Sequence, residues 1–366
     1  MSRRGYPATV RQDPIDRDMN LKEPLHFIRK AISVRKTWNL TKVLSSYALS
    51  RIVRRPIVWG LPPGLMIEPT NFCNLRCPLC PSGNGQLTRE RGFMDFDLYT
   101  RVIDEVRNRI HMVLLWNQGE SFLHKRFLDM VRYASDAGLY TLVSTNGHYF
   151  RDPEAVVRSG MDSIIISLDG ATADTYKEYR VGGNFEKVID GTRALVEAKR
   201  RLGSKTPIIS VQLILFKHNE HEIGAVHDIA ARLGADRVAY KTAQVYDTSD
   251  IQTYLPDKKE FRRYEVDGEQ FRMANGSPGV PNRCWKLWSQ PVVNWDGSVA
   301  PCCFDKNGDF SFARVGEGGT LAEIWKSRSF NAFRQRILTD RTQIEMCRNC
   351  TEGVKTFVEE RDVVVK

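Results

Sequence analysis

Short apolar segments alternate with amphipathic segments over most of the chain. The apolar runs predict strands over residues 64–68, 111–116, 140–145, 162–168, 207–216 and 236–242. Apolar positions at helical spacing predict helices over residues 97–109, 123–137, 153–159, 185–201 and 220–233. This alternation is typical of a parallel α/β sheet or barrel, in which functional groups gather at the carboxyl ends of the strands. Polar segments follow three of the predicted strands, at residues 119–120, 144–147 and 167–170.

The pattern changes after residue 245. Residues 246–283 are rich in Asp, Lys, Arg and Gly, which is typical of a bridging segment. Two apolar stretches then flank Asp296-Gly297 and predict a β-hairpin, and a helix is predicted over residues 321–338. We therefore expect five parts: a basic helical extension (1–62), an α/β core (63–245), the bridging segment (246–283), a small hairpin-and-helix domain (284–352) and a C-terminal tail (353–366).

Composition excludes several classes of protein. The chain has 366 residues, of which 42% are hydrophobic, so it is long and apolar enough to bury a large core. Even the most apolar strand, at residues 207–216, contains Ser210 and Gln212, and no run approaches the roughly 20 apolar residues of a membrane span. The N-terminus mixes arginines with aspartates and lacks the apolar region of a secretory signal. We expect a cytoplasmic protein.

Positive charge is concentrated at the N-terminus. The formal net charge is +10, and residues 1–62 hold 13 Arg or Lys against 4 Asp or Glu, which is +9. A nearly neutral main body argues against a nucleic-acid binder. Apolar residues recur at helical spacing at positions 25, 28 and 32 and again at 40, 43, 44 and 47, which predicts two basic amphipathic helices. They either pack on the core or adsorb to the anionic inner surface of a membrane.

The eight cysteines fall into two groups. In a reducing compartment such clustering indicates metal or cluster ligation rather than disulfides. Cys73, Cys77 and Cys80 form a C-x3-C-x2-C loop directly after a predicted strand. Three thiolates hold one face of an inorganic cluster and leave one coordination corner open, whereas structural zinc prefers four closed ligands.

The second group contains a closed set of four thiols. Cys284, Cys302, Cys347 and Cys350 surround the predicted hairpin and helix and end in a C-x-x-C pair. By itself this set fits either structural zinc or an iron-sulfur cluster. Cys303 should face the opposite side of its strand from Cys302, so we expect it to be a packed free thiol.

Residues 64–242 resemble the radical S-adenosylmethionine (SAM) superfamily. The resemblance rests on the cysteine loop at a strand end followed by the α/β repeats, and it implies a partial (β/α)6 barrel. It further implies a [4Fe–4S] cluster on Cys73, Cys77 and Cys80 whose open iron binds SAM. By the same resemblance, the residues that contact SAM are Gln118, Gly119, Glu120, Ser144, Asn146, Ser167 and Arg180. Gln118 replaces the first glycine of the family's Gly-Gly-Glu segment, so its contact is expected through the backbone.

The C-terminal segment resembles the twitch module, a shortened relative of the SPASM auxiliary-cluster domain. The resemblance implies a second [4Fe–4S] cluster on Cys284, Cys302, Cys347 and Cys350, with zinc as the alternative. A full SPASM domain with two auxiliary clusters needs three more cysteines, and only Cys303 remains. We therefore expect one auxiliary cluster.

These resemblances imply radical chemistry. In this family an external one-electron reductant, such as flavodoxin or ferredoxin, drives SAM cleavage to a 5′-deoxyadenosyl radical that removes a substrate hydrogen atom. Peptide-modifying members often carry a leader-recognition β-sheet at the N-terminus, and residues 1–62 are predicted to be helical instead. We therefore expect an oxidoreductase of the dehydrogenase type, acting on a sugar, aminocyclitol, lipid-linked glycan or other small metabolite.

Three alternatives stay open. They are a peptide- or protein-modifying SPASM-type maturase, a radical epimerase, and a non-enzymatic iron-sulfur electron carrier. No residue is assigned as the catalytic base. The candidates by position at strand ends and near the second cysteine group are Lys241, Gln244, Tyr246 and Asp305.

Overall fold

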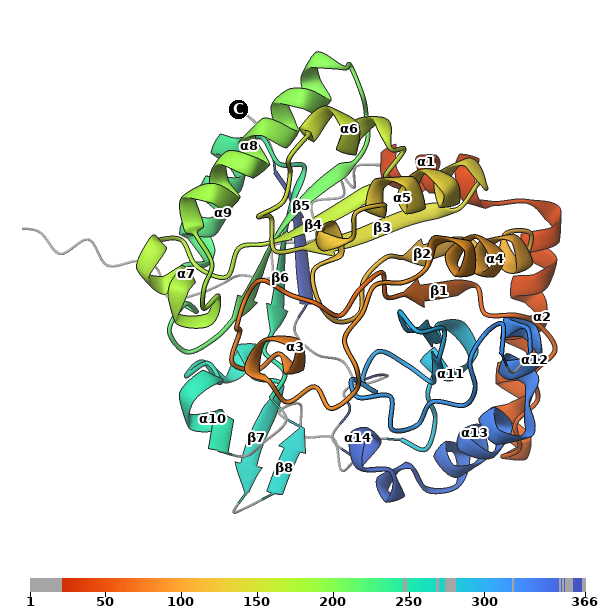
Figure 1. Ribbon diagram of the computed structural model, residues 1–366. Helices are drawn as coiled ribbons and strands as arrows, with labels where there is room; N and C mark the ends of the chain where they lie inside the picture. The colour runs from red at the N-terminus through yellow and green to blue at the C-terminus, as the bar shows by residue number, and fades with distance from the viewer. Residues whose placement is uncertain are drawn as a thin grey trace, which may run out of the picture.

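The computed structural model describes residues 22–245, 249–267, 270–273, 281–317, 319–348, 350, 352 and 358–363. Six parallel strands form the centre of the molecule and lie in chain order across the sheet (Figure 1). They are β1 (Gly64–Ile67), β2 (Met112–Leu114), β3 (Tyr140–Thr145), β4 (Ser163–Ser167), β5 (Ile208–Leu215) and β6 (Arg237–Thr242). This arrangement confirms the predicted α/β class with its parallel barrel sheet.

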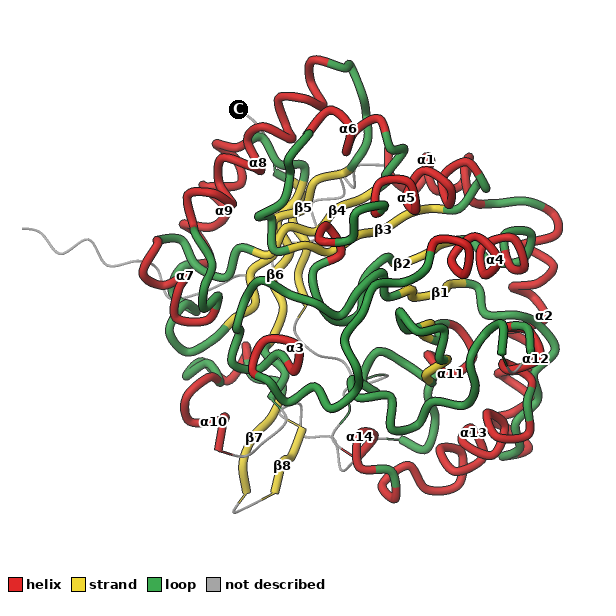
Figure 2. The backbone as a smooth tube through the Cα atoms, in the orientation of Figure 1, coloured by secondary structure: helices red, strands yellow, loops and turns green. Residues whose placement is uncertain are grey.

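Helices follow the strands and cover the outer face of the sheet, as the tube view shows (Figure 2). They are α4 (Phe96–Val106), α5 (Phe127–Asp136), α6 (Pro153–Arg158), α7 (Ala173–Tyr179), α8 (Phe185–Arg201) and α9 (Ile223–Leu233). The sequence pattern did not predict α7, because its seven residues are too few for a clear period. It begins at a capping box formed by Thr172 and Thr175.

The main core lies between the sheet and these helices. Val113, Val143, Ile164 and Val211 come from four neighbouring strands and are at most 1% exposed. Burying a side chain of this size is worth about 1.5–3 kcal/mol, so the sheet is held chiefly by this apolar layer. The polar strand ends are thereby fixed on a rigid frame.

Two C-terminal segments extend the barrel sheet at its two edges. Strands β9 (Val292–Val293) and β10 (Val299–Ala300) form the predicted hairpin, and β9 pairs in parallel with β1 through Met66 and Val292. At the opposite edge, β11 (Val358–Asp362) pairs antiparallel with β6. These strands lie in the ranges predicted as a hairpin-and-helix domain (284–352) and a C-terminal tail (353–366). Among the described residues, both ranges contribute strands to one nine-stranded sheet.

The helix expected over residues 321–338 is divided at Ser327. Ser327 has an extended backbone (φ −59°, ψ 159°), and its side chain accepts a hydrogen bond from Phe330 N. The result is α12 (Leu321–Lys326) followed by α13 (Arg328–Asp340). The short helices α11 (Lys286–Ser289) and α14 (Glu345–Arg348) complete this part of the chain.

The predicted N-terminal helices are present as α1 (Lys22–Ala31) and α2 (Val34–Val53), along one side of the molecule (Figure 1). The bridging segment contains α10 (Ser249–Tyr254) and a separate two-stranded sheet, β7 (Tyr264–Asp267) with β8 (Gln270–Met273). Among the described residues, no helix is both long and apolar enough to cross a membrane.

Candidate active site

The first three cysteines lie in a compact loop beyond the end of β1. Cys80 precedes the short helix α3 (Pro81–Asn84), and its backbone nitrogen donates to Cys77 O at 3.1 Å. A side chain at Gly83 would have its Cβ 2.7 Å from Cys77 N, so the loop packs closely against this helix. The three thiols therefore belong to one tightly wound segment of backbone.

Three polar side chains from outside the loop reach these thiols, two from the segments that follow β2 and β3 and one from the end of α7. Arg180 Nη1 lies 3.8 Å from Cys77 Sγ, and Asn146 Nδ2 lies 4.0 Å from Cys73 Sγ. Gln118 Oε1 lies 3.9 Å from Cys80 Sγ and accepts a hydrogen bond from Ser82 Oγ at 2.9 Å. The fold thus brings three of the predicted SAM residues to the cysteine loop, one beside each cysteine.

Gly119 and Glu120 fix the geometry between the cysteine loop and β3. Gly119 has φ +75°, and a Cβ there would lie 2.6 Å from Thr70 O and Phe72 O. The Glu120 carboxylate accepts from Thr145 Oγ1 (2.8 Å), Asn146 N (2.7 Å) and Phe122 N (3.1 Å). Burial raises the pKa of Glu120, although these hydrogen bonds oppose the shift. The Glu120 carboxylate is thus occupied in holding the end of β3. We therefore expect the predicted SAM contact of this segment to be made by its backbone atoms.

Arg180 is held by a residue that sequence analysis missed. Asp169 is fully buried and binds Arg180 Nε at 2.6 Å, while its other oxygen accepts from Ile214 N at 2.7 Å. Asp169 stands in the Ser-Leu-Asp-Gly segment, where its residue type alone indicates only a turn. Ser144 is half-buried and Ser167 is buried at strand ends, and neither makes a hydrogen bond to the cysteine loop in the described structure.

The four remaining predicted ligands converge in the C-terminal part. Cys284, Cys302, Cys347 and Cys350 are each less than 10% exposed, and all four line one small pocket. Lys286 and Arg341 line the same pocket, so two cations face four thiols. Neither was predicted, because nearness in the chain to Cys284 or Cys347 does not show which side chains line the same pocket as all four thiols.

The donor sets fit iron-sulfur clusters. Burial raises the pKa of the Cys73 thiol to about 12 and that of Cys284 to about 11, so both must exchange a proton for a metal on binding. Three thiols on one loop and four buried thiols around one pocket are the ligand type that iron-sulfur clusters use.

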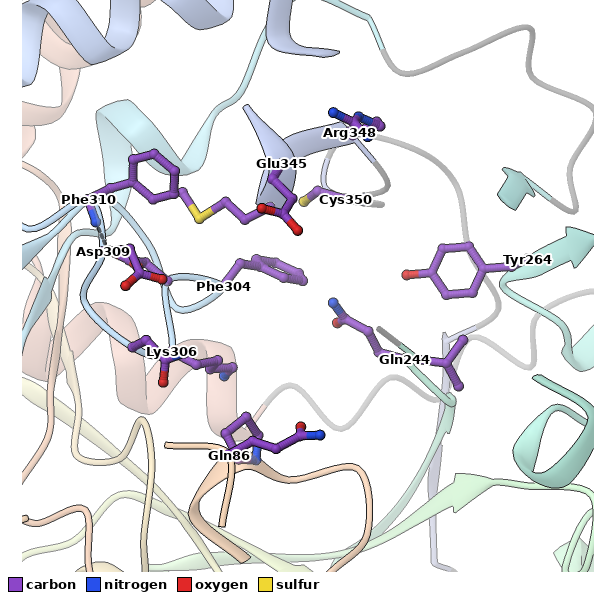
Figure 3. Close-up of a pocket in the computed structure, with 15 residues that line it drawn as sticks. Gln86, Gln244, Tyr264, Phe304, Lys306, Asp309, Phe310, Glu345, Arg348 and Cys350 are labelled. Carbon is purple, nitrogen blue, oxygen red and sulfur yellow. Dashed lines mark hydrogen bonds between the residues drawn. The ribbon is translucent and has the colours of Figure 1, made fainter. Parts of the chain in front are cut away.

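A cavity of about 410 Å³ has lining residues from both cysteine-bearing parts of the chain. Its barrel side includes Pro81, which follows Cys80, and its other side includes the predicted auxiliary ligand Cys350. Figure 3 shows Gln244 and Tyr264 facing Phe304 across this space. The volume lies within the range of small-molecule and side-chain binding pockets.

The candidate proton acceptors differ in their relation to this cavity. Gln244 and Asp305 line it, whereas Lys241 does not. Asp305 is 3% exposed, and burial raises its pKa to about 6. Burial lowers the pKa of Lys241. Tyr246 lies outside the described residues.

Comparison with known proteins identifies the two domains. A family model described as the radical SAM superfamily matches residues 67–230, and the SPASM model, an iron-sulfur cluster-binding domain, matches residues 284–351. The chain therefore contains a radical SAM domain and, at its C-terminus, a SPASM iron-sulfur cluster-binding domain. Its cofactors are SAM and two [4Fe–4S] clusters.

The chain is similar to curated proteins over most of its length. It is 24% identical over 331 residues to a tungsten-containing aldehyde ferredoxin oxidoreductase cofactor-modifying protein of Pyrococcus furiosus. The aligned region covers 82% of this chain and 90% of that protein. It is 27% identical over 315 residues to a PqqA peptide cyclase of Streptomyces rochei. The aligned region covers 80% of this chain and 82% of that protein.

Solved structures show the same fold at low identity. Streptococcus suis SuiB bound to S-adenosylmethionine superposes with a TM-score of 0.57 at 14% identity, over 86% of this chain and 78% of that one. Native anSMEcpe with bound AdoMet superposes with a TM-score of 0.56 at 15% identity. The superposed region covers 80% of this chain and 91% of that chain.

Proposed function

We propose that this protein is a maturase that oxidises a peptide or protein substrate, with the reacting side chain held between the two cluster sites. Sequence analysis favoured a small metabolite. The sequence relatives give better support to the alternative of a peptide- or protein-modifying maturase, because they include peptide cyclases and a cofactor-modifying protein. The helical N-terminus, which had weighed against peptides, is outweighed by similarity over four-fifths of the chain.

The observation that carries the proposal is the position of the cavity. Pro81, the chain neighbour of Cys80, and the predicted auxiliary ligand Cys350 both line it, so we propose that a group bound there lies between the two predicted ligand sets. Both walls are rich in polar side chains, including Gln244, Asp305 and Glu345. Such a lining suits an amide-bearing or hydroxyl-bearing substrate segment.

The two-stranded sheet of the bridging segment supports a peptide substrate. Tyr264, the first residue of β7, lines the cavity. In the described structure β7 and β8 pair with each other and with no further strand. An extended peptide that adds to such an edge gains backbone hydrogen bonds and directs alternate side chains into the neighbouring cavity.

The roles of the protein groups follow from this arrangement. When bound, SAM and its cluster supply the radical that takes one hydrogen atom from the substrate. Asp305 lines the cavity and is the group that we propose receives one proton. Cys284, Cys302, Cys347 and Cys350 hold an acceptor for the remaining electron on the same side of the cavity. One hydrogen atom, one proton and one electron together account for a two-electron oxidation.

Substrate class is tested with the anaerobically reconstituted protein, SAM and a chemical reductant. Peptides encoded beside the gene and a metabolite extract depleted of peptides are incubated separately, and 5′-deoxyadenosine is measured against a no-substrate reaction. The proposal expects stimulation by a peptide and a mass change in that peptide. Stimulation confined to the metabolite extract would reject the proposal and restore the small-metabolite interpretation.

A further inference from the structure

The two N-terminal helices are attached to the barrel through polar side chains. On α1, His26 and Lys30 both contact the buried carboxylate of Asp162, each at 2.5 Å. On α2, Lys36 Nζ donates to Gly138 O at 2.7 Å, and Asn39 Nδ2 donates to Leu61 O at 2.8 Å. The buried residues of α2 are Lys36, Asn39, Val43, Ser46 and Ser50. Four of these five are polar, which reverses the usual arrangement of an amphipathic surface helix.

The opposite faces of both helices are apolar and exposed. Val34, Trp38 and Ile52 are 87%, 60% and 78% exposed on α2, and Leu25, Ile28 and Ile32 are about half exposed on and just after α1. On α2 the positions 34, 38, 41, 45, 48 and 52 recur every three or four residues, are all exposed and carry no charge. We call the six apolar side chains the helical docking surface: Leu25, Ile28, Ile32, Val34, Trp38 and Ile52.

Basic side chains flank this surface without acidic neighbours in sequence. No Asp or Glu occurs between Glu23 and Glu68. Six basic residues, four on the two helices and two directly after α2, make no ion pair with any described residue: Arg29, Arg35, Lys42, Arg51, Arg54 and Arg55. Their charge is therefore available to an external anionic partner.

A cationic pocket lies at the end of α2. Arg51, Arg54 and Arg283 line a cavity of about 210 Å³ together with Pro281, Asn282 and Leu338. No acidic residue lines it among the described residues. Three guanidinium groups around one cavity suit a phosphate group, which arginine binds through paired N–H donors.

We propose that the helical docking surface binds a membrane of anionic phospholipids, and that the arginine pocket receives a lipid phosphate. Exposed tryptophan and aliphatic side chains insert at the headgroup boundary, while flanking arginines are attracted to anionic lipid. Both contributions are needed for stable adsorption, and both are present on the same two helices. The binding is independent of the proposed catalytic function, because the surface shares no residue with the cavity between the clusters.

Vesicle sedimentation of the full chain tests this proposal. The protein should sediment with vesicles of phosphatidylcholine mixed with phosphatidylglycerol at low ionic strength, and much less with phosphatidylcholine alone or at high ionic strength. The double variant Trp38→Ser, Ile52→Ser should weaken vesicle binding about tenfold, although the net charge of the protein is unchanged. Arg35→Gln and Arg54→Gln should each weaken it about fivefold.

Two controls separate this surface from other sources of binding. Val358→Ser removes an exposed apolar side chain from β11, which forms the edge of the sheet opposite β10. This variant should leave vesicle binding unchanged. Deleting residues 1–21 removes four arginines and three aspartates and should also leave it unchanged. SAM cleavage by each variant checks that the barrel is intact.

Three results would overturn the proposal. Equal sedimentation of the Trp38→Ser, Ile52→Ser variant and the unaltered protein would remove the surface from the binding site. Loss of binding on deletion of residues 1–21 would assign the contact to that segment. A dimer in light scattering that this double variant dissociates would assign the surface to a second copy of the chain.

Discussion

Gly119 illustrates how single residues position the SAM site. Its φ is positive, and a Cβ at this position would lie 2.6 Å from two carbonyl oxygens, so there is no room for a side chain. Gly119→Ala should therefore cost on the order of 1–3 kcal/mol from backbone strain alone and displace the cysteine loop. We expect lower iron content, measured by metal analysis, and slower SAM cleavage.

Gly224→Ala is the matched control for Gly119→Ala. A Cβ at Gly224 meets nothing within 4 Å, and alanine favours the helix α9 in which this residue lies. The control variant should keep its iron and its rate of SAM cleavage. An equal loss of iron in both variants would show that the effect of Gly119→Ala is not local.

Asp305 tests the proposed path of the proton. Its carboxylate is buried in the cavity wall, and Asp305→Asn keeps the side-chain shape while removing the acceptor. Product formation should fall by roughly a hundredfold, while 5′-deoxyadenosine still forms. Product and 5′-deoxyadenosine are measured in the same reaction by mass spectrometry. Unchanged product yield would exclude Asp305 as the proton acceptor, and Gln244→Leu gives a comparison from the same cavity.

At the residue scale, the sequence indicated the cysteines that we predict as cluster ligands and gave no signal for the residues that contact the predicted site. Cysteines are rare and their spacing is local, so both ligand sets were visible in the chain. Asp169 lies in an ordinary turn segment, and its pairing with Arg180 depends on the fold. Lys286 and Arg341 are each near one cysteine in the chain, but only the fold brings them to a pocket lined by all four. Long-range partners of this kind carry no sequence signal.

At the scale of elements, Arg89 connects the end of β1 to the cavity loop. Its guanidinium binds both oxygens of buried Glu68 at 2.6 and 2.5 Å, and its Nε donates to Lys306 O at 2.8 Å. Arg89→Met leaves the Glu68 carboxylate buried without its cation, which should destabilise the protein by about 3–5 kcal/mol. Adding Glu68→Gln should recover part of this loss. Thermal unfolding of the two single variants and the double variant measures the coupling. Additive losses would contradict a direct ion pair.

Long periodic elements were predicted well and short ones poorly. Helix α8 and strand β5 agree with the predicted ranges to within one residue, because each has enough residues to show its period. Ser327 divides the predicted C-terminal helix because its side chain caps the second half. Strand β11 reads Val-Glu-Glu-Arg-Asp, which lacks an apolar alternation, and only its pairing with β6 defines it.

At the scale of the whole molecule, the two cysteine sets should act independently in binding iron. The reconstituted chain should hold about eight iron and eight sulfide. Replacing Cys73, Cys77 and Cys80 by Ala should halve this content and abolish SAM cleavage. Replacing Cys284, Cys302, Cys347 and Cys350 should also halve it but leave SAM cleavage measurable. Stoichiometric zinc at the second set would contradict the cluster assignment.

The barrel was predictable and its junction with the C-terminal part was not. Alternating strands and helices define a parallel sheet through local connections alone. The pairing of β9 with β1 joins segments more than two hundred residues apart, and no local pattern specifies it. This junction is what brings the auxiliary cysteines to the cavity beside Cys80, so the relation between the two sites emerged only from the structure.

The central claim is that a peptide held between the two clusters is oxidised. It is tested most directly by mass spectrometry of the product formed in deuterated water. The account predicts a peptide lighter by two hydrogens, formed once per 5′-deoxyadenosine, with no solvent deuterium at the carbon that was attacked. A peptide of unchanged formula with one deuterium at that carbon would contradict it and indicate an epimerase, with Cys303 as the first hydrogen donor to test.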